Sequence, residues 1–565
     1  MEKFFDTKQM KKIVKPGALI LSLIIFVSIT GISARQYIFL DELDELLRNR
    51  IESAMYSGVI KIGNEVIYSR NALPQFYEKC AYMPAWIEDT GSLSKNAYSL
   101  ITAVKDSYME GLNPGDYHIE KIELLTKYIA GEKHGTNLPK VLVEIDILLT
   151  DAFLIYGSHL LAGKVNPETI DSEWIAIRRE RDLTEVLQKA LKENNIEKSL
   201  AGLLPEHAGY FKLKESLSKY RSISEKGGWQ KIPAGKVIKQ GDIDSRIPVI
   251  CGRLSVSGDF KSTRENSGLL YDDAIKQAAE MFQERHGLEI TGKIDDAAIK
   301  AMNVSAEERI RQIEVNLERW RWLPQYLGGK YVLVNIAGFE LDVIDDKKKI
   351  MNMRIIVGRD YRRTPVFSDS ITYLVLNPYW YVPQNIAVQD IIQKVLNDPE
   401  YLSKQKIRVF RGRGSEAGEI DPRAIEWAKL NENNFPYRLR QDPGPLNALG
   451  KVKFMFPNKF NVYLHDTSSP ELFAKNIRTF SSGCIRIEKA LELAAYLLNW
   501  SGKEIKEALN PGAGKTVKLK NPVPVHILYW TAWADDTGTI NFREDIYGRD
   551  LKLYNALKEK YEESK

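Results

Sequence analysis

A cysteine and a histidine in the C-terminal half of the chain have the types and the spacing of a nucleophile and its base. Cys484 follows the turn-like sequence Ser481-Ser482-Gly483, and His465 ends the apolar stretch 460–464, nineteen positions earlier. A thiolate attacks carbonyl carbon atoms, and the thiol needs a base within hydrogen-bond reach. We therefore predict that Cys484 is the nucleophile of an acyl transfer and that His465 is its general base.

The residues around this pair predict how it is activated. A helix expected over 488–498 begins just after the cysteine, so its positive end should lower the pKa of the thiol. The backbone carbonyl of Asp466, or another nearby acceptor, can fix the tautomer of the histidine. The N–H groups of Gly483 and of the cysteine, with the hydroxyl of Tyr463, can stabilise a developing oxyanion. The alternative is a buried, inert thiol, which is the usual state of a free cysteine.

The elements that must position these residues form a β-rich domain, predicted over 328–535. Apolar and polar residues alternate from about residue 331, and tight turns separate the strands. This pattern predicts a mostly antiparallel sheet or barrel. Between about 391 and 439 helical and glycine-rich sequence interrupts the pattern. That insertion is a candidate lid over the site, and a surface loop without function is the alternative.

The first half of the chain is predicted to be helical. Amphipathic periodicity runs through 37–235 and predicts a scaffold domain without chemistry of its own. A second unit over 236–305 combines an amphipathic helix, two glycine-containing turns and a short helix. The helix over 306–327, which Pro324 stops, links these units to the β-rich domain. With the C-terminal tail over 536–565, these parts predict a multidomain α+β protein.

The N-terminus carries a targeting signal over 1–36. Four lysines between residues 8 and 15 precede an uncharged stretch from Gly17 to Ile32, which is the layout of a signal peptide or signal anchor. A stretch of about 16 residues is short for a spanning helix, and cleavage after Ser33 is left open; a buried core helix is the alternative. We expect a periplasmic or secreted protein, or one anchored to the inner membrane if the segment is uncleaved.

Composition excludes several other classes. A length of 565 residues and a hydrophobic share of 44% predict several folded domains. A net charge of +5 over this length does not indicate the clustered basic surface that nucleic acids require. Three cysteines, Cys80, Cys251 and Cys484, are too few for a disulfide scaffold. The other histidines lack the spacing of metal ligands, and acyl transfer through a thioester needs no cofactor. We therefore expect neither a metal nor a cofactor.

Three segments of the β-rich domain carry a resemblance to a known family. They are Tyr-Leu-His-Asp-Thr at 463–467, Ser-Ser-Gly-Cys-Ile-Arg at 481–486 and the upstream segment 440–450. They resemble the catalytic domain of the L,D-transpeptidases of the YkuD type, and the order of the predicted domains is similar to the long Gram-negative YcbB-like branch. Many family members have Ser-His-Gly-Cys where this chain has Ser-Ser-Gly-Cys, so His465 remains as the base.

A second resemblance lies in the unit over 236–305. Its segments Phe-Gln-x-x-His-Gly-Leu and Thr-Gly-x-Ile-Asp resemble a helical peptidoglycan-binding module. Such a unit is either a glycan-binding module or a spacer that no longer binds glycan. Peptidoglycan stem peptides and glycan strands are the partners that these resemblances imply, and partners among wall-synthesis proteins are left open.

The resemblance to the transpeptidases implies roles for further residues. Cys484 would attack the carbonyl of the third residue of a stem peptide and expel the terminal D-alanine. An amine of a diaminopimelate on another stem would resolve the thioester and form a cross-link. Arg486 would hold a substrate carboxylate, Ser481 and Ser482 would contact the substrate, and Trp380 is either a wall of the substrate channel or ordinary packing.

The residues leave two alternative functions open. Water or a free D-amino acid can resolve the same thioester, which would make the protein an L,D-carboxypeptidase or an exchange enzyme. The second alternative is a non-catalytic peptidoglycan-binding protein with a degenerate catalytic domain. A covalent carbapenem adduct on the cysteine would separate this second alternative from an active enzyme.

Overall fold

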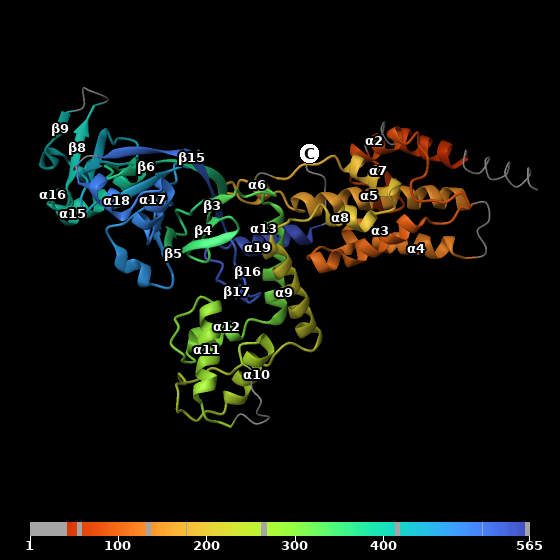
Figure 1. Ribbon diagram of the computed structural model, residues 1–565, viewed down its shortest axis with the longest axis horizontal. Helices are drawn as coiled ribbons and strands as arrows, with labels where there is room; N and C mark the ends of the chain where they lie inside the picture. Colours follow the sequence, from red (N-terminus) through yellow and green to blue (C-terminus); the bar gives the residue numbers. More distant parts are fainter. Residues whose placement is uncertain are drawn as a thin grey trace, which may run out of the picture.

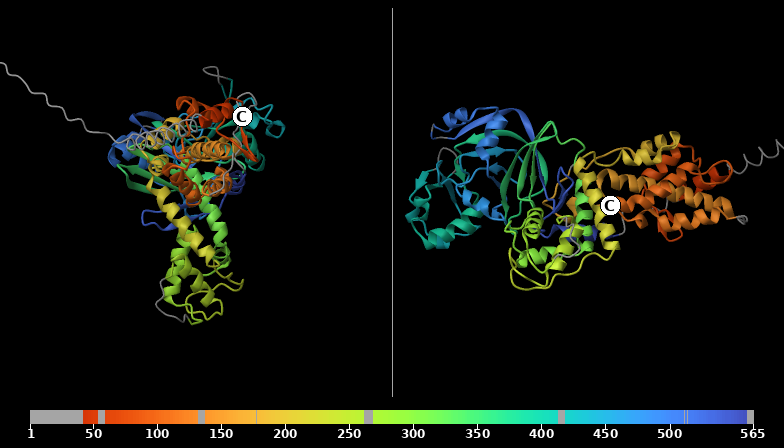
Figure 2. Two further views of the ribbon diagram at one scale, coloured as in Figure 1. Left: turned by 90° about the vertical axis from the view of Figure 1, so that its right-hand side faces the viewer. Right: turned by 60° about the horizontal axis from the view of Figure 1, so that its bottom comes forward.

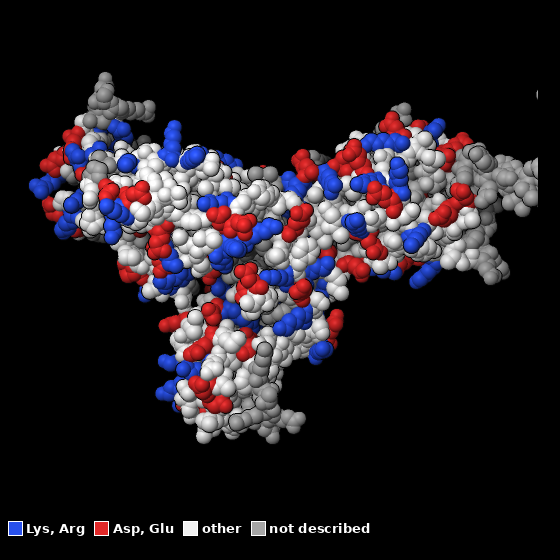
Figure 3. All heavy atoms as spheres, viewed as in Figure 1, with Lys and Arg blue, Asp and Glu red and all other residues white. Residues whose placement is uncertain are grey.

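The computed structural model describes residues 42–53, 59–131, 137–176, 178–260, 268–412, 418–510, 512 and 514–559. The predicted signal segment over 1–36 lies outside the described residues. Within the described ranges, no helix is long and apolar enough to cross a membrane. Figure 1 shows a helical lobe at one end of the long axis, a β-rich lobe at the other, and a small helical lobe that projects from the middle. Acidic and basic side chains are interspersed on the face shown in Figure 3.

The helical lobe has its own apolar core, which confirms the predicted helical scaffold. Its longest helix, α5, is buried along most of its length because apolar residues occur on all of its sides. Hydrogen bonds hold two carboxylates inside it: Asp146 accepts from the Tyr77 hydroxyl (2.6 Å), and Asp151 accepts from the Ser69 N–H (2.7 Å). The lobe contains α2 (Ala72–Lys79), α3 (Lys95–Asp106), α4 (Ile119–Ile129), α5 (Leu138–Ala162), α6 (Pro167–Ile170), α7 (Leu183–Lys192) and α8 (Ile196–Ala201).

Two helices lie between the lobes. α9 (Ala208–Glu225) packs against α13 (Ala306–Arg321), and the small lobe is inserted between them in the sequence (Figure 1). α13 begins with a capping box, in which the Ser305 hydroxyl accepts from the Glu308 N–H and the Glu308 carboxylate accepts from the Ser305 N–H. α13 ends shortly before Pro324, as predicted. The small lobe consists of α10 (Ile247–Ser257), α11 (Asp273–Arg285) and α12 (Asp296–Met302).

The small lobe uses the residues of its binding-like motif internally. The side-chain oxygen of Gln283 accepts a hydrogen bond from the Gly292 N–H (2.9 Å). His286 is buried and stacks on Phe282, with ring centroids 3.7 Å apart, and on Phe542 at 5.6 Å. Phe542 belongs to a hairpin of β16 (Ala532–Ala534) and β17 (Ile540–Phe542). The motif therefore stabilises the lobe and docks it onto the C-terminal part of the chain.

The β-rich lobe is built on a nine-stranded sheet that closes on itself. The strand order is β13-β5-β14-β12-β11-β6-β15-β3-β4, and β4 also pairs with β5. Most of these pairs are antiparallel, as predicted, while β12–β14, β13–β5 and β15–β3 are parallel. The strands are β3 (Lys330–Asn335), β4 (Glu340–Asp345), β5 (Lys348–Gly358), β6 (Phe367–Leu376), β11 (Val452–Met455), β12 (Leu464–His465), β13 (Thr479–Ser481), β14 (Ile485–Ile487) and β15 (Lys515–Leu528).

The sheet encloses one apolar core, and helices cover part of it. α17 (Ala490–Leu498) and α18 (Gly502–Leu509) follow the predicted nucleophile, and α19 (Arg549–Lys558) comes from the C-terminal tail. Leu493 of α17, Ile505 of α18 and Leu553 of α19 are buried in the same cluster as the strand residues. The C-terminal tail is therefore part of the β-rich lobe's core.

The predicted insertion is a separate layer with its own sheet. Its strands are ordered β7-β10-β8-β9, and β7 starts it at Trp380, earlier than the expected residue 391. The views in Figure 2 place it at the end of the β-rich lobe that is far from the scaffold. It contains β7 (Trp380–Tyr381), β8 (Ile407–Arg411), β9 (Gly418–Ile420), β10 (Tyr437–Gln441), α14 (Gln384–Ile386), the π-helix η4 (Ala387–Ile391), α15 (Ile392–Asn397) and α16 (Tyr401–Lys404).

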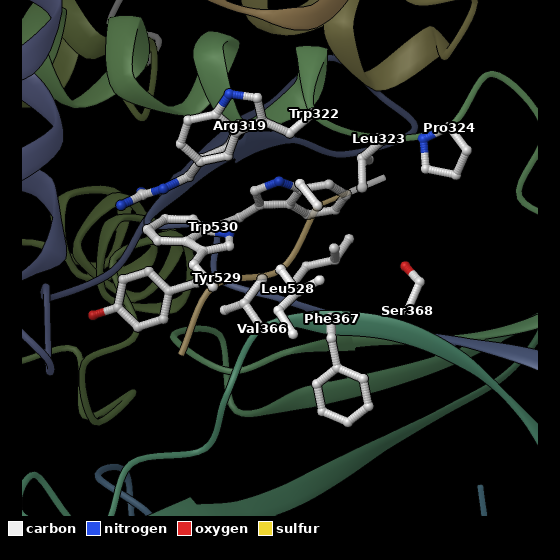
Figure 4. A pocket seen from close by; sticks show the side chains of 13 residues that line it. Arg319, Trp322, Leu323, Pro324, Val366, Phe367, Ser368, Leu528, Tyr529 and Trp530 are labelled. Carbon is white, nitrogen blue, oxygen red and sulfur yellow. The ribbon is translucent and has the colours of Figure 1, made fainter. Parts of the chain in front are cut away.

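Backbone hydrogen bonds join the scaffold to the β-rich lobe. The Ile175 N–H donates to the Val366 carbonyl, and the Val366 N–H donates to the Glu173 carbonyl, each at 2.9 Å. The rings of Trp174 and Trp322 meet edge to face at 4.9 Å. Figure 4 shows Trp322 and Val366 among the side chains that line a small pocket at this joint. The segment that precedes β6 is thus fixed directly by the scaffold.

Candidate active site

The register of neighbouring strands gathers the predicted residues on one face of the sheet. In the parallel pair β12–β14, Leu464 lies opposite Ile485 and His465 lies opposite Arg486. Leu464 and Ile485 belong to the apolar core of the lobe. Because side chains alternate between the two faces of a sheet, the residues next to them in each strand point to the opposite face.

That opposite face is the candidate active site. The Ile485 N–H donates to the Tyr463 carbonyl at 3.1 Å, which continues the parallel register to Tyr463 and Cys484. Cys484 and His465, the predicted nucleophile and base, are therefore diagonal neighbours on this face. β11 adds a fifth residue, because it places Lys453 directly opposite His465. The face holds Lys453, Tyr463, His465, Cys484 and Arg486.

The sulfur of Cys484 is partly buried and has two neighbours from the strand before it. It donates to the Asn461 carbonyl at 3.9 Å, and it is hydrogen-bonded to Tyr463. Burial raises the pKa of the thiol, while the bonds from Tyr463 and the charges of Lys453 and Arg486 lower it. Burial therefore favours the thiol form of Cys484, whereas Lys453 and Arg486 favour the thiolate form.

The predicted cause of thiol activation is wrong. Cys484 is followed by strand β14, and α17 begins only at Ala490, so the N-terminus of that helix does not adjoin the cysteine. The net shift of the thiol pKa is upward rather than downward because burial outweighs the polar contacts. The helix predicted over 488–498 begins at Ala490, and the three residues directly after the cysteine form β14, which pairs with β12 and β5.

His465 has the tautomer that a general base requires. Its Nδ1 lies 2.5 Å from the Asp466 carbonyl oxygen. A carbonyl oxygen only accepts, so Nδ1 carries the proton and Nε2 keeps its lone pair. The Asp466 carbonyl therefore makes the contact predicted for it. Its carboxylate accepts from the Lys451 N–H (2.8 Å), which fixes the same turn.

The charge state of His465 is set by its surroundings. Burial and the positive charge of Arg486 lower the pKa of the imidazole to about 3, and Lys453 acts in the same direction. The hydrogen bond to the Asp466 carbonyl opposes this shift only in part. The imidazole is therefore neutral near pH 7, which is the state that can accept a proton.

The turn that presents the cysteine is braced from within. Gly483 has φ of 110°, a left-handed conformation that favours glycine. Its N–H donates to the Ser481 hydroxyl at 3.2 Å, and that hydroxyl donates to the Cys484 carbonyl at 2.5 Å. Ser481 is 2% exposed. The structure therefore places Ser481 inside the turn as a brace, with the Gly483 N–H bonded to it.

A loop after β5 supports this turn from behind, and sequence reasoning missed it. The hydroxyl of Thr364 donates to the Gly483 carbonyl and accepts from the Gly358 N–H, each at 2.9 Å. Thr364 is fully buried. The Tyr547 hydroxyl, from the C-terminal tail, donates to the Gly358 carbonyl at 2.6 Å. A side chain at Gly358 would collide with the backbone of Arg362 and Thr364.

Arg486 and Ser482 lie on either side of Cys484 in the chain. Within the described part of the chain, the buried Nε of Arg486 has no hydrogen-bond partner. Burial and the nearby Arg359 lower the pKa of this guanidinium. An unpaired, partly dehydrated guanidinium is suited to a carboxylate ligand. Ser482 accepts from Arg362 at 2.9 Å.

Arg362 connects the nucleophile turn to the insertion. Its guanidinium donates to Gln389 and pairs with Asp390, each at 2.5 Å, and both residues belong to η4. The insertion therefore contacts the site through this arginine. Trp380 packs on the insertion's own apolar cluster, and its strand partner is Gln441. This placement favours ordinary packing over a channel wall for Trp380.

The β-rich lobe that holds these residues is similar to a known family of domains. Residues 329–526 match the family model of the YkuD L,D-transpeptidase catalytic domain. The chain contains an L,D-transpeptidase catalytic domain. Every predicted site residue lies inside this transpeptidase domain. Residues 71–217 match the model of a scaffold domain, which agrees with the helical lobe.

A curated relative and two solved structures are similar to the chain. A Haemophilus influenzae protein named "Putative L,D-transpeptidase" is 34% identical over 253 residues, 44% of this chain and 50% of the relative. The chain thus spans about half the length of the curated relative that it matches. An L,D-transpeptidase from Xylanimonas cellulosilytica is 12% identical, with a TM-score of 0.16 and coverage of 52% of this chain and 98% of that chain. One from Stackebrandtia nassauensis is 12% identical, with a TM-score of 0.21 and coverage of 52% and 94%. The placement in the YcbB-like branch stays a prediction.

Proposed function

We propose that the protein is a peptidoglycan L,D-transpeptidase that works through a thioester on Cys484. The observation that carries this proposal is the shared sheet face within the transpeptidase domain. It holds a cysteine, a histidine with a free Nε2 and an arginine with an unpaired nitrogen. Acyl transfer requires a nucleophile and a base, and the arginine adds a group that can bind a substrate carboxylate.

The first half-reaction forms the acyl-enzyme. The thiolate of Cys484 attacks the carbonyl carbon of the third stem residue, and His465 Nε2 takes the thiol proton. The tetrahedral intermediate then collapses as the C–N bond breaks, and the proton passes to the leaving D-alanine amine. A thioester remains on the sulfur. The Tyr463 hydroxyl, already at the sulfur, is placed to support the charge that develops on the carbonyl oxygen.

Substrate binding changes the basicity of His465. The charge of Arg486 is, after burial, the main cause that lowers the pKa of this imidazole. A carboxylate bound to Arg486 neutralises that charge, so the imidazole becomes more basic when the substrate is present. The low pKa in the free protein therefore fits a base that is strengthened by its substrate. The second half-reaction transfers the acyl group to the side-chain amine of a diaminopimelate.

The surroundings of the substrate fit this assignment. Peptidoglycan lies outside the cytoplasmic membrane, so the protein must be exported, in agreement with the signal predicted over 1–36. The small lobe buries its motif residues against the C-terminal hairpin. We propose that this lobe is a spacer in this protein.

The test uses the full-length protein with tetrapeptide-containing muropeptides and mass spectrometry of the products. Cross-linked dimers with loss of D-alanine are expected for the wild type, and Cys484→Ala should reduce their rate at least a thousandfold. A carbapenem should add its mass to the wild type and to Cys80→Ser, a matched variant of a partly buried cysteine outside the site, but not to Cys484→Ala. Tripeptide without dimer would favour a carboxypeptidase. Full activity of Cys484→Ala would refute the proposed nucleophile.

A further inference from the structure

We propose that Lys453 is a further functional residue of this site, whose ammonium stabilises the Cys484 thiolate directly. The proposal deepens the proposed function and rests on Cys484 being the nucleophile. Lys453 belongs to β11, a strand that contributes none of the residues assigned to the site from the sequence. Its role would be electrostatic, because it faces the sulfur without donating or accepting the transferred proton.

The strand register places Lys453 beside the reacting groups. It lies directly opposite His465 in the antiparallel pair β11–β12, so its side chain shares the face of the site. The ammonium nitrogen lies 4.0 Å from the ring centroid of Tyr463. The hydroxyl of that same ring is hydrogen-bonded to Cys484. One aromatic ring thus contacts the ammonium and the sulfur together.

Among the described residues, the charged groups that act on the sulfur are both cations. β11 contributes Lys453 and β14 contributes Arg486, and each favours the thiolate. Tyr463, which precedes β12, and His465 of β12 are neutral near pH 7. Beyond this shell, Arg359 and Glu471 act on Arg486 with opposite signs. Among the described residues, Cys484 is the one acidic group whose charge acts on Lys453, whereas Arg486 is also under the influence of Glu471.

Substrate binding should neutralise the charge of Arg486 but not the charge of Lys453. Arg486 is the proposed carboxylate ligand, and its charge is neutralised by that carboxylate. Lys453 forms no ion pair within the described ranges, and its partial burial weakens competition from water. It is then the positive charge that remains available to the sulfur during attack. Burial lowers the pKa of this ammonium, whereas the charge of Cys484 raises it.

The experiment measures thiolate formation without a substrate. Full-length protein in a Cys80→Ser, Cys251→Ala background is alkylated with iodoacetamide between pH 5 and 10, and the rate is followed by intact mass. Lys453→Met should raise the apparent pKa of the Cys484 thiol by about one unit and slow alkylation at pH 7 about tenfold. Lys453→Arg should retain the wild-type profile because it keeps the charge. Lys451→Met, an exposed lysine two positions away, is the matched control and should also leave the profile unchanged.

Folding and function are separated by the same set of variants. Thermal melting identifies a Met variant that fails to fold, and Lys453→Gln then replaces it in the same assay. A neutral variant that is folded and keeps the wild-type pH profile would overturn the role of Lys453. That result would leave the proposed function standing, because only an active Cys484→Ala variant would remove the nucleophile itself. A shift seen equally in Lys451→Met would also overturn the proposal, since it would reflect surface charge in general.

Discussion

The buried hydroxyl of Thr364 provides the most direct test of how the fold positions the nucleophile. This hydroxyl bonds both the Gly358 N–H and the Gly483 carbonyl at 2.9 Å. Thr364→Val keeps the shape of the side chain and removes both hydrogen bonds. The variant leaves a backbone donor and a backbone acceptor unpaired in a fully buried position. The turn that presents Cys484 then loses its support from behind.

The magnitude follows from the two bonds. Each buried hydrogen bond contributes about 1 kcal/mol net, and each backbone group left unpaired costs about 1 to 3 kcal/mol. Partial relaxation of the loop reduces the sum, so we expect Thr364→Val to lower the free energy of unfolding by about 2 to 4 kcal/mol. For a domain of about 200 residues this corresponds to a melting temperature lower by about 5 to 15 °C. Carbapenem acylation of Cys484 should fall at least tenfold because the turn loses its fixed geometry.

Thr364→Ser is the matched control. It keeps the hydroxyl and removes one methyl group, which costs about 1 kcal/mol. Calorimetry of the full-length protein measures the melting temperature of the β-rich lobe, and intact mass measures the rate of acylation. If Thr364→Val melts within 2 °C of the wild type and is acylated at a similar rate, the hydroxyl does not hold the turn. A Ser variant as impaired as the Val variant would assign the effect to packing instead.

Two further predictions concern the scaffold and the insertion. His118 is buried, and although burial alone would lower its pKa, the bonds to Asp151 and Glu65 raise it to about 9. This raised pKa implies that the protonated His118 stabilises the fold by about 3 kcal/mol. The stabilisation is fully present below pH 6.5 and is lost as the pH rises through 9. The melting temperature of the scaffold should therefore fall between these pH values, and His118→Gln should make it less dependent on pH. Arg362→Gln should break the link to Asp390 and change the apparent KM for muropeptide more than the substrate-free alkylation rate of the nucleophile; equal effects on both would show that Arg362 acts on the turn rather than through the insertion.

The elements of the fold could be predicted where one local pattern dominates. Alternation of apolar and polar residues predicts the strands from 330 to 376, and the end of α13 follows from Pro324. The segment after Cys484 could not be assigned in this way, because its apolar residues fit both a short strand and the start of a helix. Residues 485–487 form a strand because they pair with β5 and β12. Only the tertiary structure contains that information.

The site was predictable to the extent that its residues are close in sequence or belong to short motifs. Cys484 and His465 fall in two such motifs, and the structure places them on one face. Lys453 carries no local signal, because a lysine in a strand is ordinarily a solvent-exposed residue. Thr364 and Tyr547 lie far from the nucleophile in the chain, 120 and 63 positions away. Their roles follow from contacts between distant segments, which a single sequence does not specify.

The loop behind the nucleophile is held from both ends by parts of the chain outside the strands of the site. At its start, the Tyr547 hydroxyl of the C-terminal tail bonds the Gly358 carbonyl. At its end, the backbone of Val366 is bonded to Glu173 of the scaffold. The tail and the scaffold are themselves tied together, because Arg549 pairs with Glu173 at 3.1 Å.

We propose that this arrangement lets the helical lobe support the proposed catalytic site. A thiol reacts efficiently only when its turn is fixed relative to the base and the bound carbonyl. The loop that fixes this turn is anchored to the scaffold at one end and to the tail at the other. A displacement of the scaffold relative to the barrel must therefore move that loop or break its hydrogen bonds. We therefore predict that loosening the joint between the scaffold and the barrel slows acylation of Cys484, even though the joint lies outside the face of the candidate site.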